Sequence, residues 1–291
     1  MIEKYNWLEL FINMYQELNI IVKTLSSQGK GRSVIGNVAG RDPKEDRFLE
    51  IDKICEDHII SYIKNSPYSI EVYSEHGHFI TNPQEKVSFI MSVDPFDGTS
   101  LYKTGIPAEW WSVLTIYNPI TLKPVCAAAI DFIREDFYYS EDGIFKYCNL
   151  GDNKFIDVEL EPKNDLQSGL VLATYTMSPN YFLLWSEKSQ KLLKSLNGLS
   201  NPPRIWPNGG SCIYPWMGRG LVDIYLMFDE PNGEVNPGLG FITQKNFCAY
   251  EITDEKKLLE YSFKPESSDK KIKSFIASTN QKLVEAIIDL L

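Results

Sequence analysis

The residues best suited to chemistry form one short run of acids, glycine and hydroxyls after an apolar segment: Asp94-Pro95-Phe96-Asp97-Gly98-Thr99-Ser100. We expect the preceding strand to end at Val93. Pro95 stiffens the turn between the two aspartates, so that both carboxylates and the Phe96 carbonyl can converge on one point. Hard cations such as Mg²⁺ prefer oxygen ligands of this kind. The run therefore predicts a divalent-cation site at the end of a strand.

The residues that follow the second aspartate are suited to binding an anion. Gly98 lets the backbone approach a ligand closely, and a helical turn that opens at Gly98 offers free N–H groups to phosphate oxygens. Cation ligands beside an anion cradle are what metal-assisted phosphoryl transfer requires. Taken alone, the run is equally typical of a plain turn, because Asp, Pro and Gly all favour turns.

Two acids earlier in the chain can join this group. Glu75 ends a strand-like run and lies 19 residues before Asp94. Asp52 lies among the apolar residues of an expected helix, where an unpaired buried acid is unfavourable. By itself Asp52 is better read as a solvent-facing residue, since aspartate is mostly exposed in proteins.

The elements that must position these side chains follow from hydrophobic periodicity. Apolar residues at helical spacing predict helices over residues 3–25 and about 48–63, separated by a loop from Gly36 to Lys44. Strand-like runs follow at residues 69–73, 87–93, 110–117, 125–132 and 137–140. This half therefore reads as two helices packed on a mainly antiparallel sheet.

The second half alternates between strand-like and helical segments after a polar, loop-rich stretch at 148–167. Strands are expected at 169–175, 204–206, 222–228, 247–252 and 274–277, and helices at 181–196, 211–218, 281–290 and from about Pro237. The pattern predicts an α+β fold of layered helices and sheets, in the order α-β-α-β-α. We expect a single unit over 1–291, with a metal- and phosphate-binding half at 1–147 and a substrate-side half at 148–291.

The composition of the chain limits the kinds of partner that it can bind. The chain has 291 residues, 43% of them hydrophobic, and its 29 basic and 39 acidic residues give a net charge of −10. Such a surface repels nucleic acids and anionic membranes, so a phosphorylated ligand needs local cations. Neither a secretory leader nor an apolar run of about 20 residues is recognised, and the five cysteines form no C-x-x-C pair. We expect a soluble cytoplasmic protein that binds a small phosphorylated metabolite.

With these residues in place, the sequence resembles the inositol monophosphatase superfamily of Mg²⁺-dependent, lithium-sensitive phosphatases, which includes archaeal and bacterial fructose-1,6-bisphosphatases. The family pattern D-P-x-D-G-[TS] is matched by residues 94–99, and the first acid of its E-E pair by Glu75. The helix around Asp52 is similar to the family's helix after a flexible loop. Further similarity lies in Gly210-Ser211 with Gly220-Leu221-Val222-Asp223-Ile224-Tyr225, and in residues 274–280.

The resemblance implies a mechanism and its residues. Glu75, Asp94, Asp97 and the Phe96 carbonyl would bind two or three Mg²⁺ ions. The catalytic group would be Asp52, Thr99 and Glu75, with Asp52 and the Thr99 hydroxyl orienting or deprotonating the attacking water. The substrate would contact Asp97, Gly98, Thr99, Ser100, Gly210 and Ser211. Relatives commonly form homodimers or tetramers, so a homo-oligomer is expected as well.

The second half departs from the family pattern where the last metal ligand is expected. The usual W-D-x-A-A-G is replaced by a segment in which Glu234 matches the aspartate. The longer glutamate moves the carboxylate, which Mg²⁺ tolerates poorly, and Asp229 or Glu230 can substitute for it. His76 replaces the second acid of the E-E pair, or is simply an exposed loop residue; we read His78 in the same way and His58 as a helix-surface residue.

Substrate choice is open at this stage. Five aromatic residues can line a pocket, but we expect them to serve packing: Trp110, Trp111, Trp206, Tyr214 and Trp216. Arg204, Arg219 and Lys103 are candidates for phosphate contacts or plain surface charges. The leading hypothesis is a phosphomonoesterase for an inositol or sugar phosphate, such as fructose 1,6-bisphosphate. The alternatives are an adenosine 3′,5′-bisphosphate nucleotidase, and a relative that binds a phosphorylated ligand without turnover.

Overall fold

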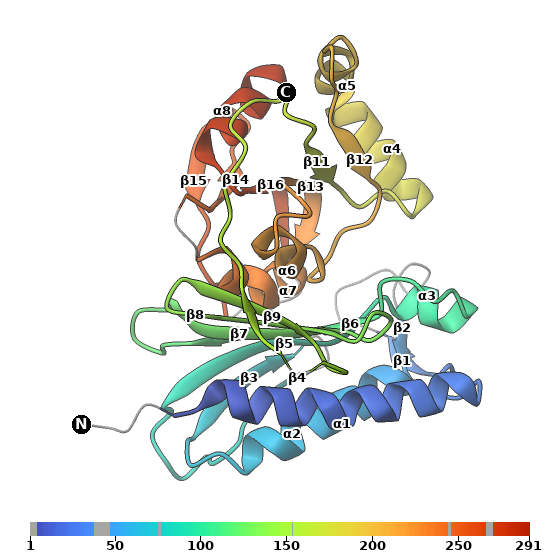
Figure 1. Cartoon of the computed structure of the whole chain (residues 1–291), viewed down its shortest axis with the longest axis vertical. Coiled ribbons are helices and arrows are strands. Elements are labelled where there is room, and N and C mark those ends of the chain that lie inside the picture. The colour runs from blue at the N-terminus through green and yellow to red at the C-terminus, as the bar shows by residue number, and fades with distance from the viewer. Residues whose placement is uncertain (1–4, 38–46, 75–76, 153, 244–245, 266–269) are drawn as a thin grey trace.

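Two amphipathic helices cover one face of the first sheet (Figure 1). The computed structural model describes residues 5–37, 47–74, 77–152, 154–243, 246–265 and 270–291. Helix α1 (Trp7–Ser27) begins at Asn6, whose side chain accepts a hydrogen bond from the Glu9 amide at 3.2 Å. Helix α2 (Glu50–Lys64) follows the short hairpin of β1 (Val34–Asn37) and β2 (Arg47–Leu49). The hairpin replaces the start of the expected 36–44 loop, and the rest of that loop lies outside the described residues.

The first sheet has eight strands in the order β10-β9-β8-β7-β6-β5-β3-β4. Neighbouring strands are antiparallel except β3 and β5, which run parallel. The strands are β3 (Ile70–Ser74), β4 (Gly77–Ile80), β5 (Phe89–Asp97), β6 (Trp111–Tyr117), β7 (Pro124–Asp131), β8 (Asp136–Glu141), β9 (Ile144–Asn149) and β10 (Ile156–Asp157). The mainly antiparallel sheet is thus confirmed, and its last two strands extend into the segment that the sequence favoured as a loop.

The second sheet has six strands in the order β12-β11-β13-β16-β14-β15. They are β11 (Val171–Ala173), β12 (Arg204–Trp206), β13 (Ile224–Pro231), β14 (Cys248–Ile252), β15 (Leu258–Glu260) and β16 (Lys271–Ser278). Besides α1 and α2, the first half has the short helix α3 (Thr99–Thr104). The helices described in the second half are α4 (Pro179–Lys188), α5 (Gln190–Asn197), α6 (Ile213–Gly218), α7 (Asn232–Val235), the 3₁₀ helix η1 (Asn236–Ile242) and α8 (Gln281–Leu290). The long helix expected over 181–196 is interrupted at Ser189, which ends α4 and caps α5.

Three apolar clusters hold the layers together. One lies between α1, α2 and the first sheet and includes Phe11 and Ile59; a second lies between the two sheets and includes Trp111 and Met217. The third packs Leu192 and neighbouring residues of α4, α5 and α8 on the outer face of the second sheet. Figure 1 shows the resulting stack, with α6 and α7 between the sheets. The predicted α+β layering is confirmed.

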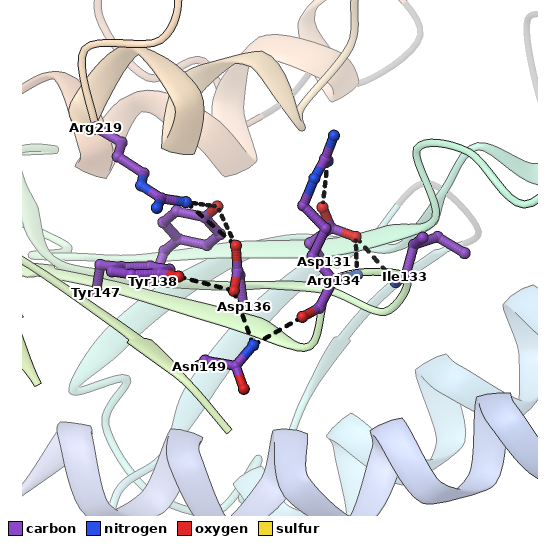
Figure 2. Close-up of polar contacts among 8 residues, drawn as sticks. All are labelled: Asp131, Ile133, Arg134, Asp136, Tyr138, Tyr147, Asn149 and Arg219. Atoms are coloured by element: carbon purple, nitrogen blue, oxygen red, sulfur yellow. Dashed lines mark hydrogen bonds and ion pairs between the residues drawn. The ribbon is translucent and has the colours of Figure 1, made fainter. Parts of the chain in front are cut away.

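A polar network ties α6 to the first sheet (Figure 2). Arg219, directly after α6, donates to Asp136 at 3.2 Å and stacks 3.8 Å from the ring centre of Tyr147. Tyr147 and Asn149 donate to the other oxygen of Asp136 at 3.0 and 3.1 Å. Tyr138 also donates to Asp136, at 3.4 Å. The carboxylate is almost fully buried, and these four partners offset its desolvation.

In the described part of the chain, no helix combines the length and apolar character needed to cross a bilayer.

Candidate active site

A bulge in β5 brings its two aspartates to one side. Asp94 pairs with Val113 of β6 and Asp97 with Trp111. An advance of three residues on β5 therefore lies opposite an advance of two residues on β6, which is a β-bulge. Pro95 lies inside this bulge, where its missing N–H does not interrupt the ladder. The strand therefore continues through Asp97, whereas the sequence analysis expected it to end at Val93.

Glu234 completes a group of three carboxylates. It lies on α7, which directly follows β13, and one oxygen from each of Asp94, Asp97 and Glu234 lies within 4.8 Å of the others. Of the other acids considered, Glu230 is buried and accepts a hydrogen bond from Tyr225 at 2.6 Å, and Asp229 is absent from the group of three. Glu234 thus joins the two aspartates in space, and its role as the last metal ligand stays a prediction.

The electrostatics of this group favour a bound cation. Desolvation, followed by the negative charge of Glu234, raises the pKa of Asp97 to about 7. Cys212 opposes this effect, with its amide 2.9 Å from Asp97 Oδ2. The Ser211 hydroxyl lies 3.2 Å from the same oxygen. Ser211 also donates to Asp94 at 2.9 Å. Convergent carboxylate oxygens are the donor set of Mg²⁺, so the residues present fit this ion.

Gly210 allows the backbone to pass close to the acids. Its φ is +102°, and a Cβ at this position would lie 2.9 Å from Asp97 and 3.1 Å from Glu234. A side chain would therefore be strained and would push into the carboxylates. The predicted residues Gly210 and Ser211 are thereby brought against the acids of the first half.

Asp52 and Thr99 form a hydrogen-bonded pair beside the acids. The Thr99 hydroxyl lies 2.8 Å from Asp52 Oδ1 and 2.9 Å from the Phe96 carbonyl oxygen. The other oxygen of Asp52 accepts the Leu49 amide at 2.6 Å, which caps α2. Asp52 is only 2% exposed, so the solvent-facing reading that we favoured for the isolated residue is wrong.

A cavity of about 570 Å³ opens beside this constellation. It is lined by Asp94, Phe96, Asp97, Gly98, Thr99, Ser100, Lys103, Gly210 and Glu234, all singled out from the sequence. Residues that the sequence analysis did not single out for the site also line it: Arg47, Tyr175, Met177, Tyr181, Asn208, Gly209, Met227 and Lys271. They lie on short strands, turns and helix starts of both halves, where no spacing pattern marks them.

Of the sequence candidates not yet placed, those that the structure describes do not line the cavity. Glu75 and His76 are outside the described residues; Ser74, just before them, pairs with Val93, just before Asp94. Arg204 is exposed, His78 contacts Glu71 at 2.8 Å, and His58 is half-buried with its Nε2 at 3.1 Å from the Met14 carbonyl. The five aromatic residues that we assigned to packing are absent from the cavity lining, and four of them are buried: Trp110, Trp111, Tyr214 and Trp216.

Part of the sequence is similar to a known phosphatase. No family model matches the chain. A segment of 147 residues is 31% identical to a fructose-1,6-bisphosphatase/inositol-1-monophosphatase of Thermococcus kodakarensis, over 50% of this chain and 52% of that protein. The match thus spans about half the length of this curated relative.

Solved structures resemble the chain over nearly its whole length. A Pyrococcus horikoshii protein described as similar to inositol-1 monophosphatase has a TM-score of 0.68 at 18% identity, covering 98% of both chains. The inositol monophosphatase of Thermotoga maritima has a TM-score of 0.67 at 16% identity, covering 98% of this chain and 96% of the other. Staphylococcal inositol monophosphatase II with bound inositol monophosphate has a TM-score of 0.65 at 17% identity, covering 98% of this chain and 93% of the other. Another structure of that protein contains bound 2′-AMP.

These matches confirm the predicted resemblance. The chain has the fold of the inositol monophosphatase and fructose-1,6-bisphosphatase superfamily, and about half of its sequence resembles a curated phosphatase of that group.

Proposed function

We propose that the protein is a Mg²⁺-dependent phosphomonoesterase for a small sugar or inositol phosphate. The observation that carries the proposal is the convergence of Asp94, Asp97 and Glu234 beside Thr99, at the wall of a metabolite-sized cavity. The phosphatase relatives support the reaction class.

In this proposal, three carboxylates hold the metal: Asp94, Asp97 and Glu234. The Phe96 carbonyl is assigned to the metal as well, and Glu75 remains a proposed ligand from outside the described residues. Bound Mg²⁺ would supply Lewis-acid chemistry, drawing charge from phosphate oxygens and lowering the pKa of water.

The Asp52–Thr99 pair is assigned to the attacking water. Because the Thr99 hydroxyl donates its proton toward Asp52 and the Phe96 carbonyl, its lone pairs remain available to accept a hydrogen bond from water. Asp52 is held by the Leu49 amide and can take up a proton that arrives through Thr99. The amides of Gly98, Thr99 and Ser100 are assigned to the phosphate, as is the Gly210-Ser211 turn.

Other lining residues of the cavity support a small polar substrate. They include Tyr175, Tyr181 and Met227 and the cations Arg47 and Lys271. A cavity of about 570 Å³ lies in the ordinary range of metabolite sites. The homo-oligomer stays part of the proposal and rests on the family resemblance, whereas the cytoplasmic setting stays part of it on the grounds of composition and cysteine spacing.

A nucleotide is the second candidate substrate. Tyr175 and Tyr181 contact each other edge to face, with ring centres 5.1 Å apart, and both line the cavity. Aromatic side chains of this kind are suited to contact with a base. The staphylococcal relative with bound 2′-AMP is a neighbour in fold.

The test is inorganic phosphate release from inositol 1-phosphate, fructose 1,6-bisphosphate and adenosine 3′,5′-bisphosphate, with Mg²⁺ and with EDTA. We expect Mg²⁺-dependent release that Asp94→Asn lowers at least about 100-fold. The preferred compound decides between the sugar and nucleotide hypotheses. Absence of release from every compound, together with intact binding of Mg²⁺ and of one of these phosphates, would instead support the binder without turnover.

A further inference from the structure

The turn at residues 208–212 is the element through which the second half reaches the acids of the first. Ser211 and the Cys212 amide donate to the aspartates, at 2.9–3.2 Å. Gly210 lies against Asp97 and Glu234 at the same time. The placement of this short turn therefore sets the positions of the acids assigned to the metal.

One end of the turn is held by a buried acid from the first half. The Asn208 side chain donates a hydrogen bond to Glu109 Oε2, and the two residues are 6% and 8% exposed. The Glu109 backbone also adopts a φ of +54°, and its carbonyl oxygen packs so closely on Gly98 that a Cβ there would lie 2.0 Å from it. Glu109 thus contacts both sides of the site.

The middle of the turn is held by a second buried acid. The Gly210 amide donates to the Tyr225 hydroxyl at 2.9 Å, and that hydroxyl donates to Glu230 at 2.6 Å. Glu230 is only 2% exposed. Because the acid takes the hydroxyl proton, the tyrosine oxygen is oriented to accept the Gly210 amide.

We propose that Glu109 and Glu230 are positioning residues, which fix the 208–212 turn through Asn208 and Tyr225 and thereby hold Asp94 and Asp97 ready for a cation. This inference rests on the proposed metal site. Buried acids are unfavourable unless hydrogen-bonded, and here Glu109 accepts directly from the turn residue Asn208, whereas Glu230 is joined to Gly210 through the Tyr225 hydroxyl. Residues that orient the ligands of a metal typically change its affinity 10–100-fold when they are replaced.

The test measures Mn²⁺ affinity of the full chain by electron paramagnetic resonance, and amide hydrogen exchange of residues 208–212 in the metal-free protein. Glu109→Ala should weaken Mn²⁺ binding by about tenfold or more and speed exchange of the turn. Glu109→Gln should stay within about threefold of the wild type, because its amide oxygen can still accept from Asn208. Tyr225→Phe should weaken Mn²⁺ binding and speed exchange of the turn as much as Glu109→Ala does, because it removes the hydroxyl that joins Gly210 to Glu230.

Asp223→Asn is the matched control. Asp223 is a buried acid of the second half that accepts from Lys163 and the Val171 amide at 3.0 and 2.8 Å, away from the turn. It should leave Mn²⁺ affinity and exchange of the turn unchanged. If Glu109→Ala does not fold, Asn208→Ala decides in its place, with the same expected loss.

Wild-type Mn²⁺ affinity and wild-type exchange in Glu109→Ala and Tyr225→Phe would overturn the inference, as would equal losses in Glu109→Gln and Glu109→Ala. A wild type that binds Mn²⁺ but releases no phosphate would count against the proposed function only. If the wild type binds no Mn²⁺, the metal assignment fails, and exchange in the metal-free variants alone decides whether the acids hold the turn.

Discussion

Asp97 shows why this cluster of residues is unfavourable without a ligand. Its carboxylate lies beside Glu234 in a desolvated position, and it is stabilised by the donors Ser211 and Cys212. These hydrogen bonds do not remove the repulsion between the two acids, and the pKa of Asp97 stays raised. A cation between the carboxylates would offset both the burial and the repulsion.

The raised pKa predicts how the metal-free protein responds to pH. The folded-state pKa of Asp97 is about 7 against an ordinary 3.8, so between these values the folded protein binds this proton more tightly than the unfolded one. Stability must therefore fall as pH rises through this window. We expect metal-free wild type to lose roughly 1–3 kcal/mol more than Asp97→Asn between pH 5 and pH 8. Urea unfolding at both pH values measures this, and equal losses would contradict it.

Gly210→Ala tests the close approach of the turn to the acids. The added Cβ meets Asp97 and Glu234 and must adopt a φ of +102°, so we expect a loss of roughly 1–3 kcal/mol and strongly weakened metal binding. Gly29→Ala is the control, because Gly29 also has a positive φ, +67°, but nothing lies within 4 Å of its Cβ position. Only the first variant should lose metal affinity, as measured by titration with Mn²⁺; equal affinities would refute the close contact.

At the level of single residues, the acids of the site could be predicted from the sequence, but the residues that hold them in position could not. Asp94, Asp97 and Thr99 stand out because acids, glycine and hydroxyls cluster in one short run, whereas Glu234 was assigned only by its match to the family pattern. Asn208 and Glu109, by contrast, are 99 residues apart and meet only through the tertiary fold. Their residue types are ordinary on any surface, so their burial could not be predicted from the chain.

Among the elements, α6 and η1 both join the second half to the first sheet. Helix η1 does so through hydrogen bonds such as that from Thr115 to the Pro237 carbonyl at 2.6 Å, and α6 through Arg219 and Trp216. Figure 2 shows Arg219 extending from the end of α6 to Asp136 and Tyr138. A second contact joins Arg134 of the first half to the face of Trp216 in α6, 5.4 Å from the ring centre. Helix α6 directly follows the 208–212 turn, so these contacts also support the site.

Replacing Arg219 should weaken this connection. Arg219→Ala leaves the buried carboxylate of Asp136 without its ionic partner and removes the stacking on Tyr147, which should lower the unfolding free energy by about 1–3 kcal/mol. Lys146→Ala is the control, because its pair with Asp157 is largely exposed and should contribute less than about 1 kcal/mol. Urea unfolding compares them; similar losses would show that the network does not stabilise the fold.

Several elements were predicted with correct or nearly correct bounds. Helix α8 and strand β12 have the expected bounds, and β6 differs by one residue. The bulge in β5 was missed because Pro and Asp next to a strand favour a turn locally, whereas pairing with β6 extends the strand. Strand β10 was missed because its two exposed residues at the edge of the sheet show no strand pattern, whereas β9, which is paired on both sides and contains apolar residues, was simply not recognised.

Considered as a whole, the molecule forms its site where the two sheets and their helices meet. Asp52 and Thr99 come from the first half, whereas Gly210 and Glu234 come from the second, and the cavity lies between them. The layered architecture was predictable from alternating helix and strand patterns. The facing of these residues across the two halves depends on register and packing, which only the folded structure defines.

The most direct measurement is the Mg²⁺ dependence of phosphate release in Glu234→Gln and Asp229→Asn. The two acids are close in sequence, but only Glu234 belongs to the group of three carboxylates. We expect Glu234→Gln to raise the Mg²⁺ concentration for half-maximal activity by about tenfold or more, with Asp229→Asn close to the wild type. A normal Mg²⁺ response in Glu234→Gln, or phosphate release by the wild type that persists in EDTA, would contradict the proposed metal-dependent phosphatase.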